Sequence, residues 1–274
     1  MTGESVLLTD DSDGVRTLTL NRPHRKNAID PALWTALRDA LTEAAHEHAV
    51  RALVLTGAGG AFCSGADLTS AATDARHPLE KLRDLNEVAL LLHELPVPTV
   101  AKVTGVAVGA GWNLALGCDL VVATPETRFS QIFTRRGLSP DCGGTWLLPR
   151  LVGLQQAKRL ALLAETIDAE EARSLGLVTW VVDAEKIDAY VAELAARLAA
   201  GPPVALAQTK ALLHENPVRS LRDALCAEAR AQAVNFATTD VAEAYAAFAE
   251  KREPHFTGRW YRQPPSEDTS CAKQ

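Results

Sequence analysis

Two glycine-rich stretches carry the residue types best suited to chemistry in this 274-residue chain. Residues 105–119 read GVAVGAGWNLALGCD, and their turn at Gly109, Ala110 and Gly111 joins a β-type run at 98–103 to an apolar helical pattern. The first backbone N–H groups of a helix have no partner within it, and small side chains let another molecule approach them. Such amides stabilise a carbonyl oxygen that gains negative charge. A tight packing turn between a strand and a helix would explain this stretch equally well.

A second stretch, residues 52–68, repeats the arrangement. Its first part, ALVLT at 52–56, is apolar and β-branched and predicts a short buried strand. Glycines follow at 57, 59, 60 and 65 and again permit close approach to the backbone. Two sets of backbone donors at two strand ends would be enough for an oxyanion hole.

The elements that position these loops are predicted to alternate between strand and helix as far as residue 200. Asp30-Pro31 forms a helix start, and apolar spacing carries that helix to about residue 47. Gly201-Pro202-Pro203 marks a boundary, after which only helical patterns follow, at 204–215, 221–236 and 241–251. The expected organisation is an α/β core at 1–200, a helical module at 201–262 and a disordered tail at 263–274.

Composition narrows the class of protein. A hydrophobic fraction of 47% and a charged fraction of 23% are ordinary for a globular protein, and the net charge of −6 argues against a nucleic-acid partner. The longest uncharged run, residues 103–118, is shorter than the ~20 residues of a membrane span. The N-terminus is polar and the five cysteines form no CxxC pair, so we expect a cytoplasmic protein without a metal site.

Three ordered motifs give the chain a resemblance to a known family. The strings AFCSGADL, GVAVGAGWNLALGCDLVVAT and GLSPDCGGTWLLPRLVG resemble the enoyl-CoA hydratase/isomerase (crotonase) superfamily, and the likeness runs from NRPHRKNAI to PHFTGR. The resemblance implies a spiral of repeated ββα units with a C-terminal helical trimerisation module. It also implies an acyl-CoA thioester substrate, assembly as a homotrimer or hexamer, and no cofactor beyond the CoA that the substrate carries.

The same resemblance assigns the site residues. The oxyanion donors would be the N–H groups of Ala66 and Ala110, the latter at a position where many relatives have glycine. The helix expected at 78–95 would cover the acyl pocket. Two further groups are expected at the site: the substrate-binding residues Ser64, Leu68, Asn113 and Phe133, and the CoA-binding residues Arg22, Arg25, Lys26, Phe256 and Arg259.

The positions of the two catalytic glutamates of the family's hydratases differ in this chain. They are occupied by Asn113 and Phe133. A hydratase must hold a water, deprotonate it and protonate the α-carbon, and neither residue exchanges protons at neutral pH. Hydration of the usual kind is therefore doubtful.

Asp141, in LSPDCGGT, is the remaining candidate for acid/base work. Taken alone, it would be read as the N-cap of the helix that follows. Relatives that isomerise dienoyl-CoA esters carry an aspartate there, and the whole string most resembles phenylacetate-pathway isomerases. We favour a proton-shuttling Asp141 and isomerisation of an enoyl- or aryl-acetyl-CoA. The alternatives are a hydratase, a hydrolase or dehalogenase with Asp141 as nucleophile, and a non-catalytic acyl-CoA-binding protein. Cys142 is more readily explained as buried packing than as a nucleophile.

Overall fold

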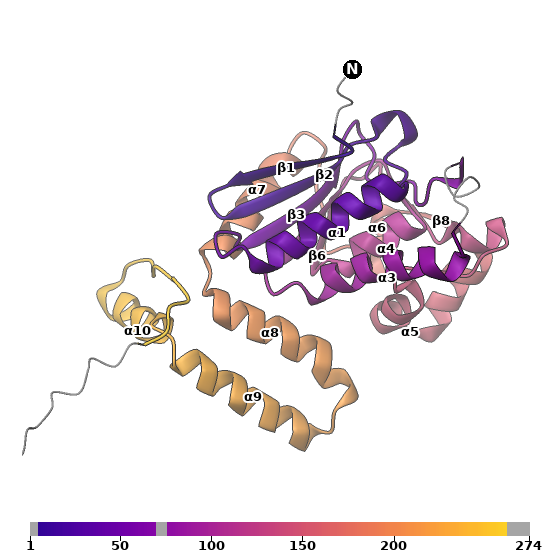
Figure 1. Ribbon diagram of the computed structural model, residues 1–274. Helices are drawn as coiled ribbons and strands as arrows, with labels where there is room; N and C mark the ends of the chain where they lie inside the picture. Colours follow the sequence, from indigo (N-terminus) through magenta and orange to yellow (C-terminus); the bar gives the residue numbers. More distant parts are fainter. Residues whose placement is uncertain (1–4, 70–75, 262–274) are drawn as a thin grey trace, which may run out of the picture. The chain divides into compact units, whose positions relative to one another are not determined.

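The computed structural model describes residues 5–69 and 76–261 (Figure 1). The tail expected at 263–274 lies outside this part of the chain. Contacts between Cα atoms divide the chain into two units, Met1–Ala199 and Ala200–Gln274, which we describe one at a time. No helix among the described residues is long and apolar enough to cross a bilayer.

The first unit is built on a six-stranded sheet in the order β1-β2-β3-β4-β6-β9. β1 and β2 form an antiparallel hairpin, and every later pairing in this sheet is parallel. Parallel neighbours need a crossover connection, and helices supply it here. The strands are β1 (Leu7–Ser12), β2 (Val15–Leu20), β3 (Ala52–Gly57), β4 (Thr99–Val103), β6 (Leu120–Ala123) and β9 (Trp180–Val181).

Helices cover both faces of this sheet, as the alternating side chains of β3 show. Leu53 and Leu55 belong to one apolar cluster with α1 (Pro31–His46), which lies along the strands in Figure 1. Val54 points the other way, into a cluster with α7 (Ile187–Ala200). Burial on both faces explains why the strand is uniformly apolar. The Asp30 side chain caps α1 by accepting from the Leu33 amide, as the sequence predicted.

A second, three-stranded sheet was not expected from the sequence. It runs in the order β5-β7-β8, and each strand has three residues, too few to give an alternating pattern. β5 (Val106–Val108) leads into α4 (Ala110–Gly117), and β7 (Arg128–Ser130) leads into the short 3₁₀ helix η2 (Ile132–Arg136). β8 is Thr166–Asp168. The turn at Gly109 therefore begins at the end of a strand of this sheet, and the sheet supports it.

The remaining helices of the first unit pack around these two sheets. α3 (Pro78–Glu94) lies beside α1 (Figure 1). α5 (Gly144–Leu163) is interrupted by non-helical backbone at Gly153. α6 is Ala169–Ser174, and the Asp168 side chain caps it by accepting from the Glu171 amide.

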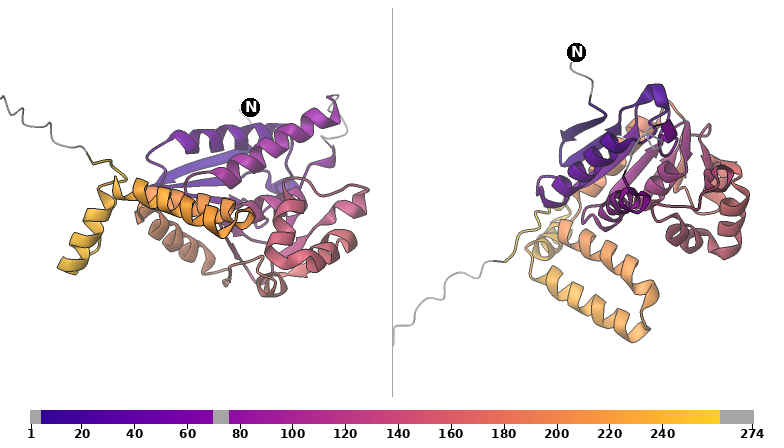
Figure 2. Two further views of the ribbon diagram at one scale, coloured as in Figure 1. Left: turned by 90° about the horizontal axis from the view of Figure 1, so that it is seen from below. Right: turned by 45° about the vertical axis from the view of Figure 1, so that its right-hand side comes forward.

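The second unit is helical, as its sequence pattern predicted. α8 (Pro203–Glu215) and α9 (Leu221–Phe236) run side by side (Figures 1 and 2), joined through the 3₁₀ helix η3 (Asn216–Val218). α10 (Asp240–Glu250) follows, and its Asp240 carboxylate accepts from the amides of Thr257 and Gly258. Large apolar side chains of this unit remain exposed: Leu213, Val218, Leu221, Leu225, Phe236, Tyr245 and Phe248.

Candidate active site

The loop after β3 exposes the backbone of Ala66. Its neighbours form a β-bridge to Ile29: the Ile29 amide donates to the Gly65 carbonyl over 2.8 Å, and the Asp67 amide donates to the Ile29 carbonyl over 2.9 Å. These bonds use groups on either side of Ala66 and leave its own N–H outside the bridge. Ala66 is also exposed. Its amide is therefore available to a ligand.

The turn between β5 and α4 presents a second amide. Gly109 caps α4 with φ 56° and ψ −127°, a conformation that side chains strongly disfavour. Ala110 is the first residue of α4, so its N–H has no acceptor within the helix. The helix dipole adds positive potential at this amide.

These two loops lie directly against each other. A Cβ placed on Gly65 would come within 2.9 Å of the Val108 carbonyl oxygen and 3.8 Å of the Ala110 nitrogen. A Cβ on Gly111 would come within 2.7 Å of Cys63 Sγ. Glycine at both positions thus allows the contact. The structure brings the amides predicted as oxyanion donors into one place.

A cavity of about 680 Å³ opens beside the first of these loops. This volume lies in the range of small-molecule sites. Its lining comes from the donor loop, the residues that flank and form α1, the N-terminal half of α3, and the segment before α5. The lining residues are Ile29, Pro31, Trp34, Thr35, Arg38, Ala66, Asp67, Leu68, Arg76, Pro78, Lys81, Leu82, Asp84, Leu85, Leu138 and Asp141.

Asp141 lines this cavity and does not cap the following helix. The N-cap of α5 is Gly143, which receives no side-chain hydrogen bond. The Asp141 Oδ1 atom is buried without a hydrogen-bond partner. Burial raises the pKa of this carboxyl group above its ordinary value, and a hydrogen bond with the Cys142 side chain offsets only part of that effect. A carboxyl group of this kind is a stronger base than a solvated one.

The other two carboxylates of the cavity lining are paired. Asp67 Oδ2 lies 2.9 Å from Arg22 Nη2, and Asp84 Oδ2 lies 2.7 Å from Arg76 Nη1. Of the carboxylates that line this cavity, Asp141 is thus the one placed to exchange a proton.

Cys142 is buried and remains a thiol. Burial raises its pKa well above the ordinary value, and the neighbouring Asp141 carboxyl raises it further. Since the thiolate is the reactive form, Cys142 is unsuited to act as a nucleophile. This agrees with the packing role expected from the sequence.

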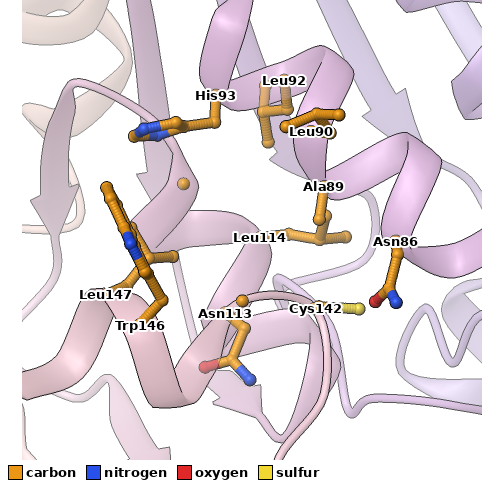
Figure 3. A pocket seen from close by; sticks show the side chains of 12 residues that line it. Asn86, Ala89, Leu90, Leu92, His93, Asn113, Leu114, Cys142, Trp146 and Leu147 are labelled. Atoms are coloured by element: carbon orange, nitrogen blue, oxygen red, sulfur yellow. The ribbon is translucent and has the colours of Figure 1, made fainter. Parts of the chain in front are cut away.

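A smaller cavity, of about 360 Å³, lies between α3, α4 and the start of α5 (Figure 3). His93 and Trp146 face each other across it, with ring centroids 5.2 Å apart in an edge-to-face arrangement. The Arg150 guanidinium carbon sits 3.9 Å from the Trp146 ring centroid. Its lining residues are Asn86, Ala89, Leu90, Leu92, His93, Asn113, Leu114, Gly117, Cys142, Gly143, Trp146 and Leu147.

Three of the residues expected to bind substrate have side chains that pack against or bond to other parts of the protein. Phe133 is buried behind the oxyanion turn, where its Cζ would meet a Cβ on Gly109 at 3.6 Å, and it lines neither cavity. The Ser64 hydroxyl donates to the Arg25 carbonyl oxygen. Asn113 borders the smaller cavity, but its side-chain amide bonds to protein groups on both sides. Leu68 lines the larger cavity as expected.

The basic residues expected at the CoA have different surroundings. Arg22 is largely buried and pairs with Asp67 and Asp30, so its charge is already engaged within the protein. Arg25 and Lys26 are exposed on the same loop. Phe256 and Arg259 belong to the second unit. Their contact with CoA, like that of Arg25 and Lys26, remains a prediction.

Two buried links in this region could not be predicted from the sequence. The Asn27 side chain donates to the carbonyl oxygens of Ala58 and Ala61 over 2.9 and 2.7 Å. The ion pair between Arg22 and Asp67 joins residues 45 positions apart. Both links tie the loop at 22–27 to the loop that carries Ala66.

Comparison with known proteins assigns the family. The model of the family described as "Enoyl-CoA hydratase/isomerase" matches residues 10–259. The chain belongs to the enoyl-CoA hydratase/isomerase family. The resemblance stated from the sequence motifs is therefore confirmed, and the paired sheets with their helices are the crotonase fold.

Individual members of the family carry different names. A "Probable enoyl-CoA hydratase" of Rhodobacter capsulatus is 44% identical over 90% of this chain and 96% of its own length. The 1,2-epoxyphenylacetyl-CoA isomerase of Escherichia coli is 38% identical over 92% of this chain and 98% of its own. A crystal structure of an enoyl-CoA hydratase from Bacillus anthracis matches with a TM-score of 0.88 at 31% identity, covering 93% of this chain and all of that one. Hydratases and isomerases of the family are thus both similar to this chain.

Proposed function

We propose that this member of the enoyl-CoA hydratase/isomerase family isomerises an enoyl- or aryl-acetyl-CoA thioester, with Asp141 as acid and base. The proposal rests on one contrast. The positions that hold the hydratases' glutamates carry Asn113, whose amide is bonded to protein groups, and Phe133, which is buried. Asp141 instead lines the cavity beside Ala66 with an unpartnered carboxyl oxygen.

The reaction would proceed through an enolate. The N–H groups of Ala66 and Ala110 would donate to the thioester carbonyl oxygen, which lowers the free energy of the enolate formed when a neighbouring C–H loses its proton. Asp141 would accept that proton and return it to another carbon of the same conjugated system. The double bond or ring rearranges, and the composition of the substrate does not change. One carboxyl group suffices, because the proton removed is the proton given back.

Hydration is the second candidate, because the relative from Rhodobacter capsulatus is named as a hydratase. It would require the site to hold a water molecule, take its proton and protonate the α-carbon. One carboxyl group would have to do this without the two glutamates of the family's hydratases.

A panel of enoyl-, dienoyl- and aryl-acetyl-CoA esters, analysed by mass and by absorbance, separates the alternatives. Isomerisation changes the absorbance at constant mass, hydration adds the mass of one water, and hydrolysis releases free CoA. We expect constant mass with changed absorbance. Rapid hydration of crotonyl-CoA would contradict the proposal, and binding without turnover across the panel would favour a non-catalytic acyl-CoA-binding protein.

Asp141→Asn tests the residue. Asparagine keeps the shape of the side chain and loses its basicity, so the isomerisation rate should fall about 10²–10⁴-fold while CoA esters still bind. Asp84→Asn, a second carboxylate of the cavity lining but one paired with Arg76, is the matched control and should retain most of the activity. Full isomerase activity in Asp141→Asn would exclude Asp141 as the base.

A further inference from the structure

The side-chain amide of Asn113 forms hydrogen bonds to Asp141 and to Gln131. Asn113 is 1% exposed on α4. Its Nδ2 donates to the backbone carbonyl oxygen of Asp141 over 2.8 Å, and its Oδ1 accepts from Gln131 Nε2 over 2.8 Å. Gln131 is equally buried and follows β7 directly. The donor from Gln131 therefore fixes which end of the Asn113 amide faces Asp141.

Asn113 also packs on the far end of the same loop. A Cβ on Gly144 would lie 2.4 Å from Asn113 Nδ2, so only glycine allows this approach. The Gly144 amide donates to the Asp141 carbonyl oxygen over 2.9 Å. Asn113 thus contacts the loop of residues 141–144 at both of its ends.

The backbone conformation of the loop at 141–144 requires support from neighbouring groups. Cys142 and Gly143 both have left-handed backbone, with φ 46° and 77°, and a non-glycine residue is strained there. A strained conformation persists only where the surrounding structure determines it. The two hydrogen bonds to the Asp141 carbonyl are those determinants.

Asn113 and the second oxyanion donor share one short helix. Ala110 is the first residue of α4, and Asn113 follows one turn later. The backbone N–H of Asn113 donates to the Gly109 carbonyl oxygen over 3.0 Å. The strand before Gln131 also supports the turn, since the Gly109 amide donates to the Ser130 carbonyl oxygen over 2.9 Å. The positions of Asp141, the proposed base, and of the Ala110 amide, an oxyanion donor, therefore both depend on α4 and on the end of β7.

We propose that Asn113, oriented by Gln131, is a positioning residue that fixes the Asp141 carboxyl group relative to the amide of Ala110. This rests on the proposed acid/base function of Asp141. The position where hydratases hold a catalytic glutamate serves here to anchor the other carboxylate. Asn113 acts on the rate through the geometry of Asp141, and CoA affinity does not depend on it.

Asn113→Ala is the first test. Misplacement of a reacting group by about 1 Å costs on the order of 10²-fold in rate, so we expect kcat for isomerisation to fall about 10–100-fold while the Kd for CoA stays within about threefold. Loosening the loop admits water to Asp141, and the midpoint of the pH–rate profile should move to lower pH. An unchanged kcat and midpoint would overturn the proposal.

Gln131→Met is a milder variant, and it tests the positioning role of Asn113 even if Asn113→Ala does not fold. Gln131 Oε1 has no partner, so methionine of similar shape removes one known hydrogen bond, the one that orients Asn113. We expect the same direction of change in kcat and midpoint. Thr99→Val is the control for lost stability, because Thr99 is buried, bonds Asp119 over 2.8–3.0 Å and lines neither cavity. A rate loss in Gln131→Met no larger than in Thr99→Val would contradict the proposal.

The double variant tests whether Asn113 acts through Asp141. In an Asp141→Asn background, Asn113→Ala should cause no further loss of rate, because the group that it positions is gone. Losses that multiply would overturn the proposal. If Asp141→Asn alone retains isomerisation, the proposed function fails. If Asp141→Asn is inactive and Asn113→Ala is as active as wild type, the positioning role fails and the function stands.

Discussion

The proposed reaction depends on the environment of a single carboxyl group, that of Asp141. Asp141 has one buried oxygen without a hydrogen-bond partner, while Asp67 and Asp84 in the same cavity each face an arginine. Two of the carboxylates are engaged in ion pairs, and burial raises the pKa of the third, Asp141. Because all three residues are aspartates, the difference between them arises from the groups that surround each carboxyl group.

The pH–rate profile should report this environment. Because burial raises the pKa of Asp141, the carboxylate that accepts the proton forms only above a midpoint higher than the ~3.9 of an ordinary aspartate. We expect kcat/KM for isomerisation to rise with pH through that midpoint. Initial rates between pH 4 and 9 at constant ionic strength would measure it. A profile that is flat down to about pH 4 would show that no group of raised pKa acts as the base.

At the scale of elements, α4 organises the site through its first turn. Its N-terminus offers the Ala110 amide, and Gly109 before it adopts φ 56° and ψ −127°. Phe133 and Ile132 close the space behind Gly109, where a Cβ would meet them at 3.4–3.6 Å. The aromatic residue at the position of the second hydratase glutamate therefore supports the turn instead of exchanging protons.

Gly109→Ala should disturb both stability and rate. Alanine in this backbone region costs roughly 1–3 kcal/mol, and relief of the strain would move the Ala110 amide. We expect a lower Tm together with at least a tenfold loss of isomerisation, about 1.4 kcal/mol in transition-state binding. Gly176→Ala, at another positive φ of 80° but away from the cavities, should lower Tm and leave the rate of the folded protein unchanged. Equal effects of the two substitutions on rate would speak against a special role for this turn.

Long periodic elements were predictable from the sequence, and short ones were not. The helices α1, α3, α9 and α10 begin and end within about a residue of their predicted limits, because caps and apolar spacing mark them. β5, β7 and β8 were missed because three residues cannot show a period. The family motifs indicated the two donor loops.

The parts of the site that escaped prediction depend on pairing across the chain. Nothing local to Arg22 signals that Asp67, 45 residues away, will neutralise it. Nothing local to Asn113 signals that its amide faces the carbonyl of Asp141, 28 residues on. Residue type suggested a ligand contact in both cases, and tertiary structure decides otherwise.

At the scale of the whole molecule, the second unit carries apolar side chains that its own helices leave open. Phe248 is 87% exposed, Leu221 76% and Tyr245 67%. Exposed apolar groups of this size mark surfaces that associate. We expect a homotrimer or hexamer, and light scattering at micromolar concentration would measure it. Phe248→Arg should weaken the assembly, with Leu8→Arg on β1 as the control. A wild-type protein of monomer mass would refute the expectation.

Binding of CoA should depend on the exposed cations of the loop at 22–27. Arg25→Ala should raise the Kd for CoA roughly 3–10-fold at low salt, since a phosphate contact at the surface is worth on the order of 1 kcal/mol. The effect should shrink at high salt, where such contacts are screened. Arg197→Ala, an exposed arginine on α7, changes the net charge equally and should leave Kd unaltered. Equal Kd values in Arg25→Ala and wild type at both salt concentrations would remove Arg25 from the CoA contacts.

The buried ion pair between Arg22 and Asp67 has a consequence for turnover. Together with Asn27, it fastens the loop at 22–27 to the loop that presents Ala66. If the nucleotide end of a CoA substrate contacts the first loop, as predicted above, the free energy of that contact would help to align the thioester at the loop that carries Ala66. Remote binding energy spent in this way raises kcat. A thioester shortened to its pantetheine arm would accordingly lose turnover as well as affinity.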